Sequence, residues 1–401
     1  MSKKSIPKIR FQNFKNEWID STIGRHISLL NGRAYKQEEL LDEGKYRVLR
    51  VGNFNTNSKW YYSNLELEEN KYVNKGDLLY LWATNFGPEI WTEEKAIYHY
   101  HIWKLEFDRT EINQDYLNIW LESDKNKIQQ NTNGSTMIHI TKNMMEERRI
   151  SLPYFEEQSA IGSLFRTLDD LLTSYKDNLT NYQSLKATML YKMFPKAGQT
   201  VPEIRLDGFE GEWEIVKLGD NCRIITGGTP RTGVKEFWNP KEIPWMSSGE
   251  INKKILNETE EMISYIGLEN SSAKWVKQNS VLIALAGQGQ TRGRVAINKI
   301  PLTTNQSIAA IETKDNIDFL FLYTDLSRRY DELRLISSGD GTRGGLNKKI
   351  ISNLELNLPT LEEQQAIGAY FSNLDNLINS HQEKITQLET LKKKLLQDMF
   401  I

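Results

Sequence analysis

The chain contains one long stretch twice. Residues 150–194 and 356–400 align without a gap, and about 19 of the 45 paired positions are identical. Each copy opens with Leu-Pro, followed after two residues by Glu-Glu-Gln and then, one residue later, by Ala-Ile-Gly. A repeat of this length indicates a duplicated domain rather than a solenoid of short units.

Each copy of the stretch predicts one long helix. The proline before the first turn and the acidic pair within it suit the free N–H groups and the positive dipole end of a helix start. Apolar residues then recur every seven positions, with a second apolar row beside them, which is typical of a coiled-coil seam with a wide apolar face. The seam is predicted to include Ile161, Leu168, Leu172, Leu179, Ile367, Leu374, Ile378 and Leu388.

The duplication extends beyond these helices. A shorter motif within residues 6–24 recurs within 201–219, and a more variable region of similar length separates motif from helix in each half. Pro195 and Gly198 are expected to end the first helix and release the chain into the second half. The predicted domains are 1–152 (with the motif 6–24), 153–198 (first helix and linker), 199–358 (with the motif 201–219) and 359–401 (second helix).

The two variable regions share a weaker skeleton. Short β-rich runs alternate with Gly, Asn, Ser and Thr turns, which predicts strands. Each region is therefore interpreted as mixed α+β with a curved antiparallel sheet, in which Asp115 corresponds to Asp318 at the start of a helix. The segments that correspond between the two regions are 27–36 with 222–231, 46–55 with 243–252, 76–80 with 279–283, and 101–106 with 307–312.

Composition narrows the class of protein. The formal net charge is -2, so any nucleic-acid binding must use local basic patches, and a tight hold on phosphates would depend partly on partners. Cys222 is the single cysteine, which excludes an internal disulfide and fits a reducing compartment. No apolar run approaches the ~20 residues of a membrane span, and the N-terminus lacks a signal-peptide pattern. We expect a cytoplasmic protein.

Catalytic signatures are not found in the sequence. Residues 228–233 have the glycine spacing of a phosphate loop, but Val234-Lys235 follows where Lys and Ser/Thr are required. Residues 287–293 fail the dinucleotide pattern, and no methyltransferase-like Asn-Pro-Pro-aromatic tetrad occurs. His99 and His101 could share a metal on one strand face, but no third ligand lies nearby in sequence, so packing or a hydrogen bond to a base or phosphate is the favoured interpretation.

What remains is a set of polar loops in both variable regions. Arg and Lys can bind guanine edges, Asn and Gln adenine edges, while small residues let the backbone approach phosphates. Solvated loops have a similar composition, but their occurrence in both halves favours function. The candidate DNA-binding residues are Arg33, Tyr35, Lys36, Asn53, Asn55, Lys59, Thr84, Asn85, Ser135, Thr136, Thr229, Arg231, Ser247, Ser248, Gln288, Gln290, Arg292, Arg294, Thr342 and Arg343.

The doubled Leu-Pro-x-x-Glu-Glu-Gln-x-Ala-Ile-Gly helix, with a variable domain before each copy, resembles the specificity subunit of type I restriction–modification enzymes. The resemblance covers essentially the whole chain. It implies an α+β fold in which two mixed α/β target recognition domains are joined by two long antiparallel coiled-coil helices with pseudo-twofold symmetry. It also implies that each domain recognises one half of an asymmetric, split DNA site, with half-sites ~34–36 Å apart.

The same resemblance implies partner subunits, and it implies that this chain has no catalytic site of its own. Two methyltransferase subunits are expected to dock on the helices, and two motor-nuclease subunits to join them. Adenine methylation would take place in the partner, because a flipped base needs an active-site pocket. S-adenosylmethionine, ATP and Mg²⁺ would be bound by partner subunits, and this chain would bind no cofactor or metal and contribute no catalytic residue.

Two other functions stay open at this point. The chain could be an orphan DNA-binding protein or regulator that recognises split sites outside restriction, which tight specific binding without a partner would indicate. It could also be an enzyme with a hidden nuclease or methyltransferase centre, which cleavage or methyl transfer by the isolated chain would indicate. The bases recognised, the spacer length and the partner stoichiometry do not follow from the sequence.

Overall fold

The computed structural model describes residues 7–55, 57–83, 86–131, 140–287, 291–336 and 345–400. The chain divides into two compact units. Unit 1 comprises Met1–Lys176 with Glu383–Ile401, and unit 2 comprises Asp177–Gln382. Each unit therefore combines one variable region with the beginning of one long helix and the end of the other, whereas the boundaries drawn from the sequence give each helix a segment of its own.

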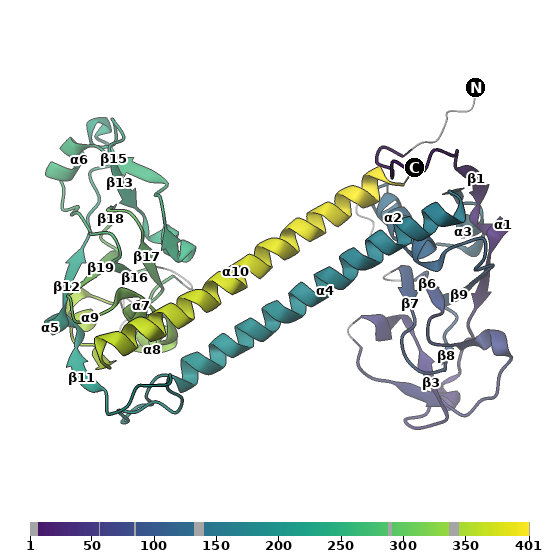
Figure 1. The fold of residues 1–401 in the computed structure, drawn as a ribbon, viewed down its shortest axis with the longest axis horizontal. Coiled ribbons are helices and arrows are strands. Elements are labelled where there is room, and N and C mark those ends of the chain that lie inside the picture. The colour runs from purple at the N-terminus through teal and green to yellow at the C-terminus, as the bar shows by residue number, and fades with distance from the viewer. Residues whose placement is uncertain are drawn as a thin grey trace. The chain divides into compact units, whose positions relative to one another are not determined.

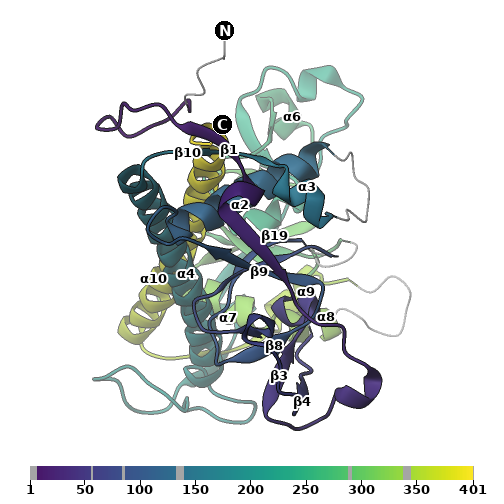
Figure 2. The same ribbon diagram turned by 90° about the vertical axis from the view of Figure 1, so that its right-hand side faces the viewer.

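Unit 1 contains ten strands and three shorter α-helices among its described residues (Figure 1). The strands are β1 (Ile19–Thr22), β2 (Ile27–Asn31), β3 (Tyr46–Leu49), β4 (Tyr61–Ser63), β5 (Tyr72–Val73), β6 (Leu78–Leu81), β7 (Gly87–Ile90), β8 (Ala96–Tyr98), β9 (Ile102–Phe107) and β10 (Arg149–Leu152). The helices are α1 (Ile23–His26), α2 (Gln114–Asn131) and α3 (Lys142–Glu146), with 3₁₀ turns η1 (Gln37–Glu39), η2 (Val51–Phe54) and η3 (Glu69–Lys71). The sheet orders are β2-β9-β6-β7 and β4-β3-β8-β5, and β1 pairs antiparallel with β10 directly before the first long helix (Figure 2).

Unit 2 repeats this order with two differences among the described strands: β14 pairs with β17, and no named strand takes the place of β5. Its strands are β11 (Glu214–Lys217), β12 (Cys222–Thr226), β13 (Ile243–Met246), β14 (Ile255–Leu256), β15 (Glu261–Ile263), β16 (Val281–Ala284), β17 (Val295–Asn298), β18 (Thr303–Thr304), β19 (Ile308–Thr313) and β20 (Glu355–Leu358). Its helices are α5 (Leu218–Asn221), α6 (Tyr265–Glu269), α7 (Phe319–Arg328), α8 (Tyr330–Ile336) and α9 (Lys348–Ser352), with η4 (Lys235–Phe237) and η5 (Ser248–Lys253). The sheet orders are β12-β19-β16-β17-β14, β15-β13-β18 and β11-β20.

The four pairs of corresponding segments predicted from the sequence form equivalent elements in the two units. These are β2 and β12, β3–η2 and β13–η5, β6 and β16, and β9 and β19. The expectation of one antiparallel sheet per region is wrong. Each region forms two main sheets, and β3 pairs parallel with β8 as β13 does with β18. Parallel pairing needs a long crossover, and the chain between β3 and β8 is long enough to return in the same direction.

The two predicted long helices are present as α4 (Phe155–Lys192) and α10 (Leu361–Asp398). In unit 1 Lys392 Nζ lies 2.8 Å from Asp169 Oδ1, and in unit 2 Lys186 Nζ lies 2.5 Å from Asp375 Oδ1. These two ion pairs occupy the same positions of the repeat. Since each joins a late residue of one helix to an early residue of the other, the helices run antiparallel within each unit.

The candidate seam residues differ in burial along the helices. The candidates up to Leu172 in α4 and up to Leu374 in α10, together with Leu388, are almost completely buried, while Leu179 and Ile378 are only half-buried. Ile367 and Leu374 belong to a core of unit 2 that also contains residues of its recognition region and is contacted by Tyr182 and Met189 of α4. The buried members are Ile161, Leu168, Leu172, Ile367, Leu374 and Leu388.

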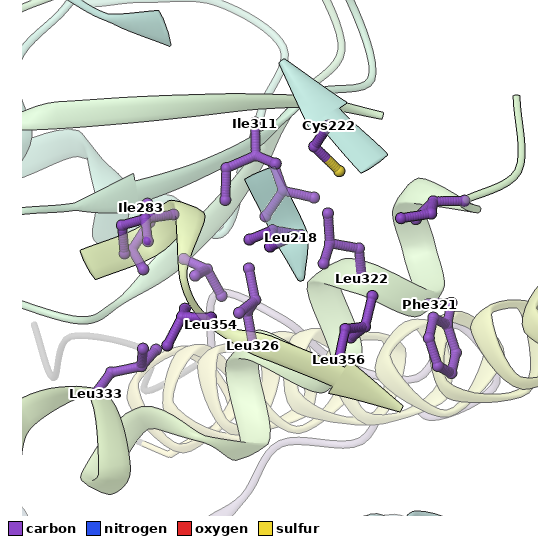
Figure 3. Packing of buried hydrophobic residues seen from close by; sticks show 14 of the residues in the cluster. Leu218, Cys222, Ile283, Ile311, Phe321, Leu322, Leu326, Leu333, Leu354 and Leu356 are labelled. Carbon is purple, nitrogen blue, oxygen red and sulfur yellow. The ribbon is translucent and has the colours of Figure 1, made fainter. Parts of the chain in front are cut away.

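The largest core of unit 2 lies between its sheet and the long helices (Figure 3). Leu218 comes from α5, Ile311 from β19, and Leu322 and Leu326 from α7. Phe194 follows the end of α4 and stacks on Phe321 with 5.6 Å between ring centroids. This core therefore holds together three segments far apart in sequence. No helix in the described parts of the chain is long and apolar enough to cross a membrane.

Candidate nucleic-acid interface

The repeated helix motif forms the same buried ion pair in both units. The Arg10 guanidinium donates from Nε and Nη2 to the two carboxylate oxygens of Glu157, each at 2.7 Å. Arg205 binds Glu363 in the same way, again at 2.7 Å through both nitrogens. Both glutamates are almost inaccessible to solvent. A bidentate pair fixes orientation, so these glutamates anchor the shorter upstream motif to the start of each long helix.

The motif glutamine ties each long helix to the next layer. Gln158 Oε1 accepts the backbone N–H of Asn113, and Gln364 Oε1 accepts that of Asp318, both at 2.9 Å. Asn113 and Asp318 in turn cap α2 and α7 through their side-chain oxygens. Asn113 is therefore the counterpart of Asp318, and the expected correspondence of Asp115 with Asp318 is wrong by two residues. An aspartate was matched to an aspartate, whereas the cap can be either Asn or Asp.

The motif glycine permits a close approach of two helices. A Cβ added to Gly162 would lie 2.9 Å from the backbone nitrogen of Tyr116, and one added to Gly368 would lie 2.9 Å from that of Phe321. Real Cβ atoms do not tolerate such distances to backbone. Together the motif residues form a framework, and the candidate recognition surfaces lie elsewhere in each unit.

One turn in each unit has the same backbone frame but different side chains. The N–H of His99, between β8 and β9, donates to the carbonyl of Leu49 at 2.8 Å, and the N–H of Asn305, between β18 and β19, donates to that of Met246 at 3.0 Å. His99 Nδ1 and Asn305 Oδ1 each accept a backbone N–H from two residues further on, at 3.5 and 3.1 Å. Residues 99–101 are His-Tyr-His, whereas 305–307 are Asn-Gln-Ser.

In unit 1 this turn carries an aromatic cluster. The Tyr100 and His101 rings lie 4.0 Å apart, and the Trp82 ring lies 4.9 Å from His101. Trp82 Nε1 donates to the Tyr100 carbonyl at 2.9 Å, which fixes the indole beneath the turn. Tyr100 is 38% exposed. Aromatic surfaces held in this way can stack on bases or contact a thymine methyl group.

The surroundings of the turn keep His99 neutral. Burial, together with the nearby His101 and Arg50, lowers the pKa of His99 to about 4. At neutral pH His99 is uncharged, so its ring nitrogens can serve as one donor and one acceptor. His99 and His101 have ring centroids 4.8 Å apart. Among the described residues no group of three or more His, Cys, Asp or Glu side chains could hold a metal ion.

In unit 2 the corresponding turn presents amides. Gln306 is exposed and Asn305 is half-buried. Gln306 Oε1 accepts the hydroxyl of Thr229 at 2.5 Å, which holds the amide in one orientation. Asn and Gln amides match the donor and acceptor pattern of an adenine edge. The two units thus present different chemistry from the same position.

Two of the candidate residues of unit 1, Arg33 and Tyr35, lie beside its aromatic cluster. Arg33 Nη2 donates to Glu39 Oε1 at 2.7 Å, and its guanidinium lies 5.4 Å from the centroid of the Tyr35 ring. Tyr35 stacks on His99 at 6.4 Å, and burial raises its pKa, so it stays a phenol. Lys36 is exposed. Arg33 and Tyr35 are therefore part of the same surface as the turn.

The candidate residues in and after η2 contribute mainly to their own loop. Asn53 Oδ1 accepts the N–H of Arg50, and its Nδ2 donates to the Lys59 carbonyl, both at 3.1 Å. Asn55 Nδ2 donates to the Val51 carbonyl at 3.2 Å. The Lys59 side chain is exposed. These amides fix the loop, and the ammonium group of Lys59 remains accessible.

The candidate residues of unit 2 are divided among three loops. Arg231 is exposed after β12, while Ser247 and Ser248 are half-buried at the start of η5. Arg292 and Arg294 are half-buried on the segment that enters β17. The remaining candidates lie outside the described residues: Thr84, Asn85, Ser135, Thr136, Gln288, Gln290, Thr342 and Arg343.

The turn residues Tyr100, Asn305 and Gln306, and Trp82 beneath the first turn, were not among the sequence candidates. A signal was present, because the strands that follow the turns were aligned correctly and the three residues before them differ between the halves. It was missed because neither tripeptide is rich in Gly or in basic residues. Only the backbone hydrogen bonds identify the two turns as equivalent.

Comparison with known proteins agrees with this architecture. The sequence matches the family described as "Type I restriction modification DNA specificity domain" over residues 15–181 and 210–390. It is 24% identical to the type I restriction enzyme MjaVIII specificity subunit of Methanocaldococcus jannaschii, over 95% of this chain and 91% of that protein. It is 22% identical to the EcoBI specificity subunit of Escherichia coli, over 93% and 84%.

A solved structure has the same fold. The crystal structure of the S subunit of a type I restriction-modification system from M. genitalium superposes with a TM-score of 0.65 at 16% identity, covering 99% of both chains. The family match covers both halves of this chain, and each of the two units contains one variable region. The chain therefore belongs to the family of type I restriction–modification DNA specificity subunits and contains two recognition domains.

Proposed function

We propose that each unit of this specificity subunit recognises one half of an asymmetric, bipartite DNA site. The observation that carries this proposal is the pair of equivalent turns at residues 99–101 and 305–307. A common backbone frame would present each turn to the duplex in the same way. Because one turn carries aromatic rings and the other amides, the two half-sites would differ in sequence.

The long helices would set the unrecognised spacer between the half-sites and dock two methyltransferase subunits. The chain itself would not be catalytic. It would direct an adenine-N6 DNA methyltransferase, and with two motor-nuclease subunits a restriction endonuclease. S-adenosylmethionine, ATP and Mg²⁺ would be bound by those partners. The buried Arg10–Glu157 and Arg205–Glu363 pairs support separate roles for the helices and the recognition regions, because they anchor the upstream motif to the long helix in the same way in both units.

The direct test is methylome sequencing of a host that expresses this chain with and without its cognate methyltransferase subunit. Methyladenine at a split, asymmetric motif, present only with both proteins, is the expected result. If a soluble complex forms and no new methylation appears, the methylation role is wrong. Tight specific DNA binding by the chain alone would then point to an orphan regulator.

Exchange of the turn side chains tests the assignment of half-sites. Replacing His99, Tyr100 and His101 by Asn, Gln and Ser should change only the half-site of unit 1, because the backbone frame accepts both tripeptides. Methylome sequencing of the variant complex measures this. The matched control is Lys95→Ala, a change to an exposed ion pair of the same unit, which should leave both half-sites unchanged. A change in both half-sites after the turn exchange would contradict the model of two independent recognition domains.

A further inference from the structure

Unit 2 contains a pocket of about 290 Å³ in which five elements meet. Asn252 and Lys254 line it from η5 and the residue after it, and Arg294 from the segment before β17. Tyr330 contributes from the start of α8, and Lys186 from the last turns of α4. The pocket thus adjoins two of the loops that carry candidate DNA-binding residues.

The lining of this pocket is positively charged. Lys186, Lys254 and Arg294 line it, and none of the described lining residues is acidic. The guanidinium of Arg294 lies 5.9 Å from the centroid of the Tyr330 ring, which orients the planar group. Asp375, which does not line the pocket, pairs with Lys186 at 2.5 Å. Ammonium and guanidinium groups that share so small a volume favour the entry of an anion.

The equivalent position in unit 1 has one more carboxylate beside its lysine. Lys392, which matches Lys186 in the repeat, lies 3.1 Å from Glu122 and also pairs with Asp169. Counting from the two helix caps, Ser327 of α7 occupies the place of Glu122 in α2. Ser327 lines the pocket of unit 2 with a hydroxyl. Unit 2 therefore keeps one carboxylate at this lysine, since Asp375 pairs with Lys186 as Asp169 does with Lys392, but it lacks a counterpart of Glu122.

Lys254 has an unfavourable backbone conformation. Its φ is 62° and its ψ is -44°, outside the left-handed helical basin that a few non-glycine residues adopt. The backbone is held there because the Lys254 carbonyl accepts the N–H of Ile297 at 2.8 Å. Glycine would adopt this conformation without steric cost. A lysine at this position, at the edge of a cationic pocket, indicates that its ammonium group has a role.

We propose that this pocket binds a backbone phosphate of the DNA duplex at the half-site recognised by unit 2. Ammonium groups supply point charges, and the guanidinium supplies paired donors that match a phosphate. The Asn252 amide and the Ser327 hydroxyl add neutral donors. This site would fix the register of the duplex on unit 2 without reading a base. The inference rests on the proposed function, since it requires that unit 2 bind DNA.

The test uses the chain purified with its methyltransferase subunits. The variants are Lys254→Gly and Arg294→Gln, and the control is Asn279→Gly, which relieves a similar positive φ of 62° at a position that does not line the pocket. Affinity is measured over a range of salt concentrations for the cognate duplex and for one with a scrambled second half-site. Each pocket variant should weaken binding to both duplexes and lower the salt slope by about one.

The unfolding midpoint separates binding from folding. Lys254→Gly should unfold at a higher temperature than wild type, as Asn279→Gly should, and yet bind DNA more weakly, whereas Asn279→Gly should bind as wild type does. Wild-type affinity and salt slope in both pocket variants would overturn the inference. Failure of the wild-type complex to prefer the cognate duplex would instead contradict the proposed function.

A second arm distinguishes the source of the phosphate. Inorganic phosphate and ATP are added separately as competitors at constant ionic strength. If the pocket binds the duplex backbone, neither should compete beyond the effect of ionic strength, because a single phosphate lacks the remaining contacts of the duplex. Competition by either one that is lost in Lys254→Gly would overturn the assignment and indicate a site for a free phosphate group.

Discussion

Gly162 and Gly368 illustrate what single residues decide in this fold. Each sits in the first turns of a long helix, where a favourable helix former would be expected, and each faces the start of another helix at a distance that excludes a Cβ. A glycine in a helix is less favourable than alanine. Its presence in both copies follows from the packing of α4 on α2 and of α10 on α7.

The first prediction is that Gly162→Ala and Gly368→Ala each destabilise the unit that contains them by about 1–3 kcal/mol, since the added methyl group forces two helices apart. Chemical denaturation followed by circular dichroism measures the change. Gly233→Ala is the matched control, because an added Cβ there meets nothing within 4 Å. Equal stability of Gly162→Ala and wild type would show that the close approach is not required.

His99 gives a pH-dependent prediction at the same scale. Its folded pKa is about 4, below the usual 6.5, so the unfolded chain binds more protons between these values. Stability should therefore be constant above about pH 6.5 and fall as the pH decreases towards 4. His99→Asn, the residue present in unit 2, should reduce this fall. Thermal unfolding at pH 7.5 and 5 measures it, and His26→Asn, outside the cluster, should leave the wild-type pH dependence. An undiminished fall in His99→Asn would show that other groups cause it.

At the scale of elements, local patterns predicted more than long-range pairing did. The two long helices and the segments of β2, β6, β9 and their counterparts were predictable, because capping, heptads and turn residues act over short distances. The parallel pairing of β3 with β8 was not, since it depends on where a long crossover returns. The correspondence between the helix caps Asn113 and Asp318 was also not predictable, because two different side chains form the same hydrogen bond.

The anchoring of the long helices gives an element-scale prediction. Glu157→Ala removes the carboxylate that pairs with Arg10 and leaves the guanidinium, only 14% exposed, without its partner. Loss of one member of a buried pair typically costs about 3–5 kcal/mol, and we expect a loss in that range. Glu69→Ala, which breaks an exposed pair with Lys95, is the control and should change stability by less than about 1 kcal/mol. Denaturant titration of both variants measures the difference. Similar losses of stability would show that the buried pair stabilises the fold no more than the exposed pair does.

At the scale of the whole molecule, the duplication was evident from the sequence, but the composition of the units was not. Repeat boundaries assign α4 to the first half and α10 to the second, because they follow chain order. Contacts such as Lys392–Asp169 and Lys186–Asp375 instead divide each helix between both units. The recognition residues were also only partly predictable, since side-chain type alone does not separate Asn53, which fixes its loop, from Gln306, which is exposed.

The helices lead to a prediction about the recognition site. Inserting four residues after both Ser174 and Ser380, exposed and equivalent positions of the repeat, lengthens each helix by roughly 6 Å while keeping the two in phase. The methylated motif should then keep both half-sites and gain one or two base pairs of spacer. Methylome sequencing of the complex measures the motif. Retention of the original spacer by an active complex would mean that the helices do not set it.

The last turns of α10 belong to unit 1, and this affects the order in which the protein can fold during synthesis. Ser123 Oγ donates to the Leu396 carbonyl at 3.1 Å across 273 positions of the chain. N-terminal domains generally fold first, while the rest of the chain is still being translated. Here the first domain remains incomplete until the ribosome has released α10. Contacts of such long sequence separation slow folding, and a premature stop before the last turns of α10 would leave the N-terminal domain, rather than the second one, without part of its core.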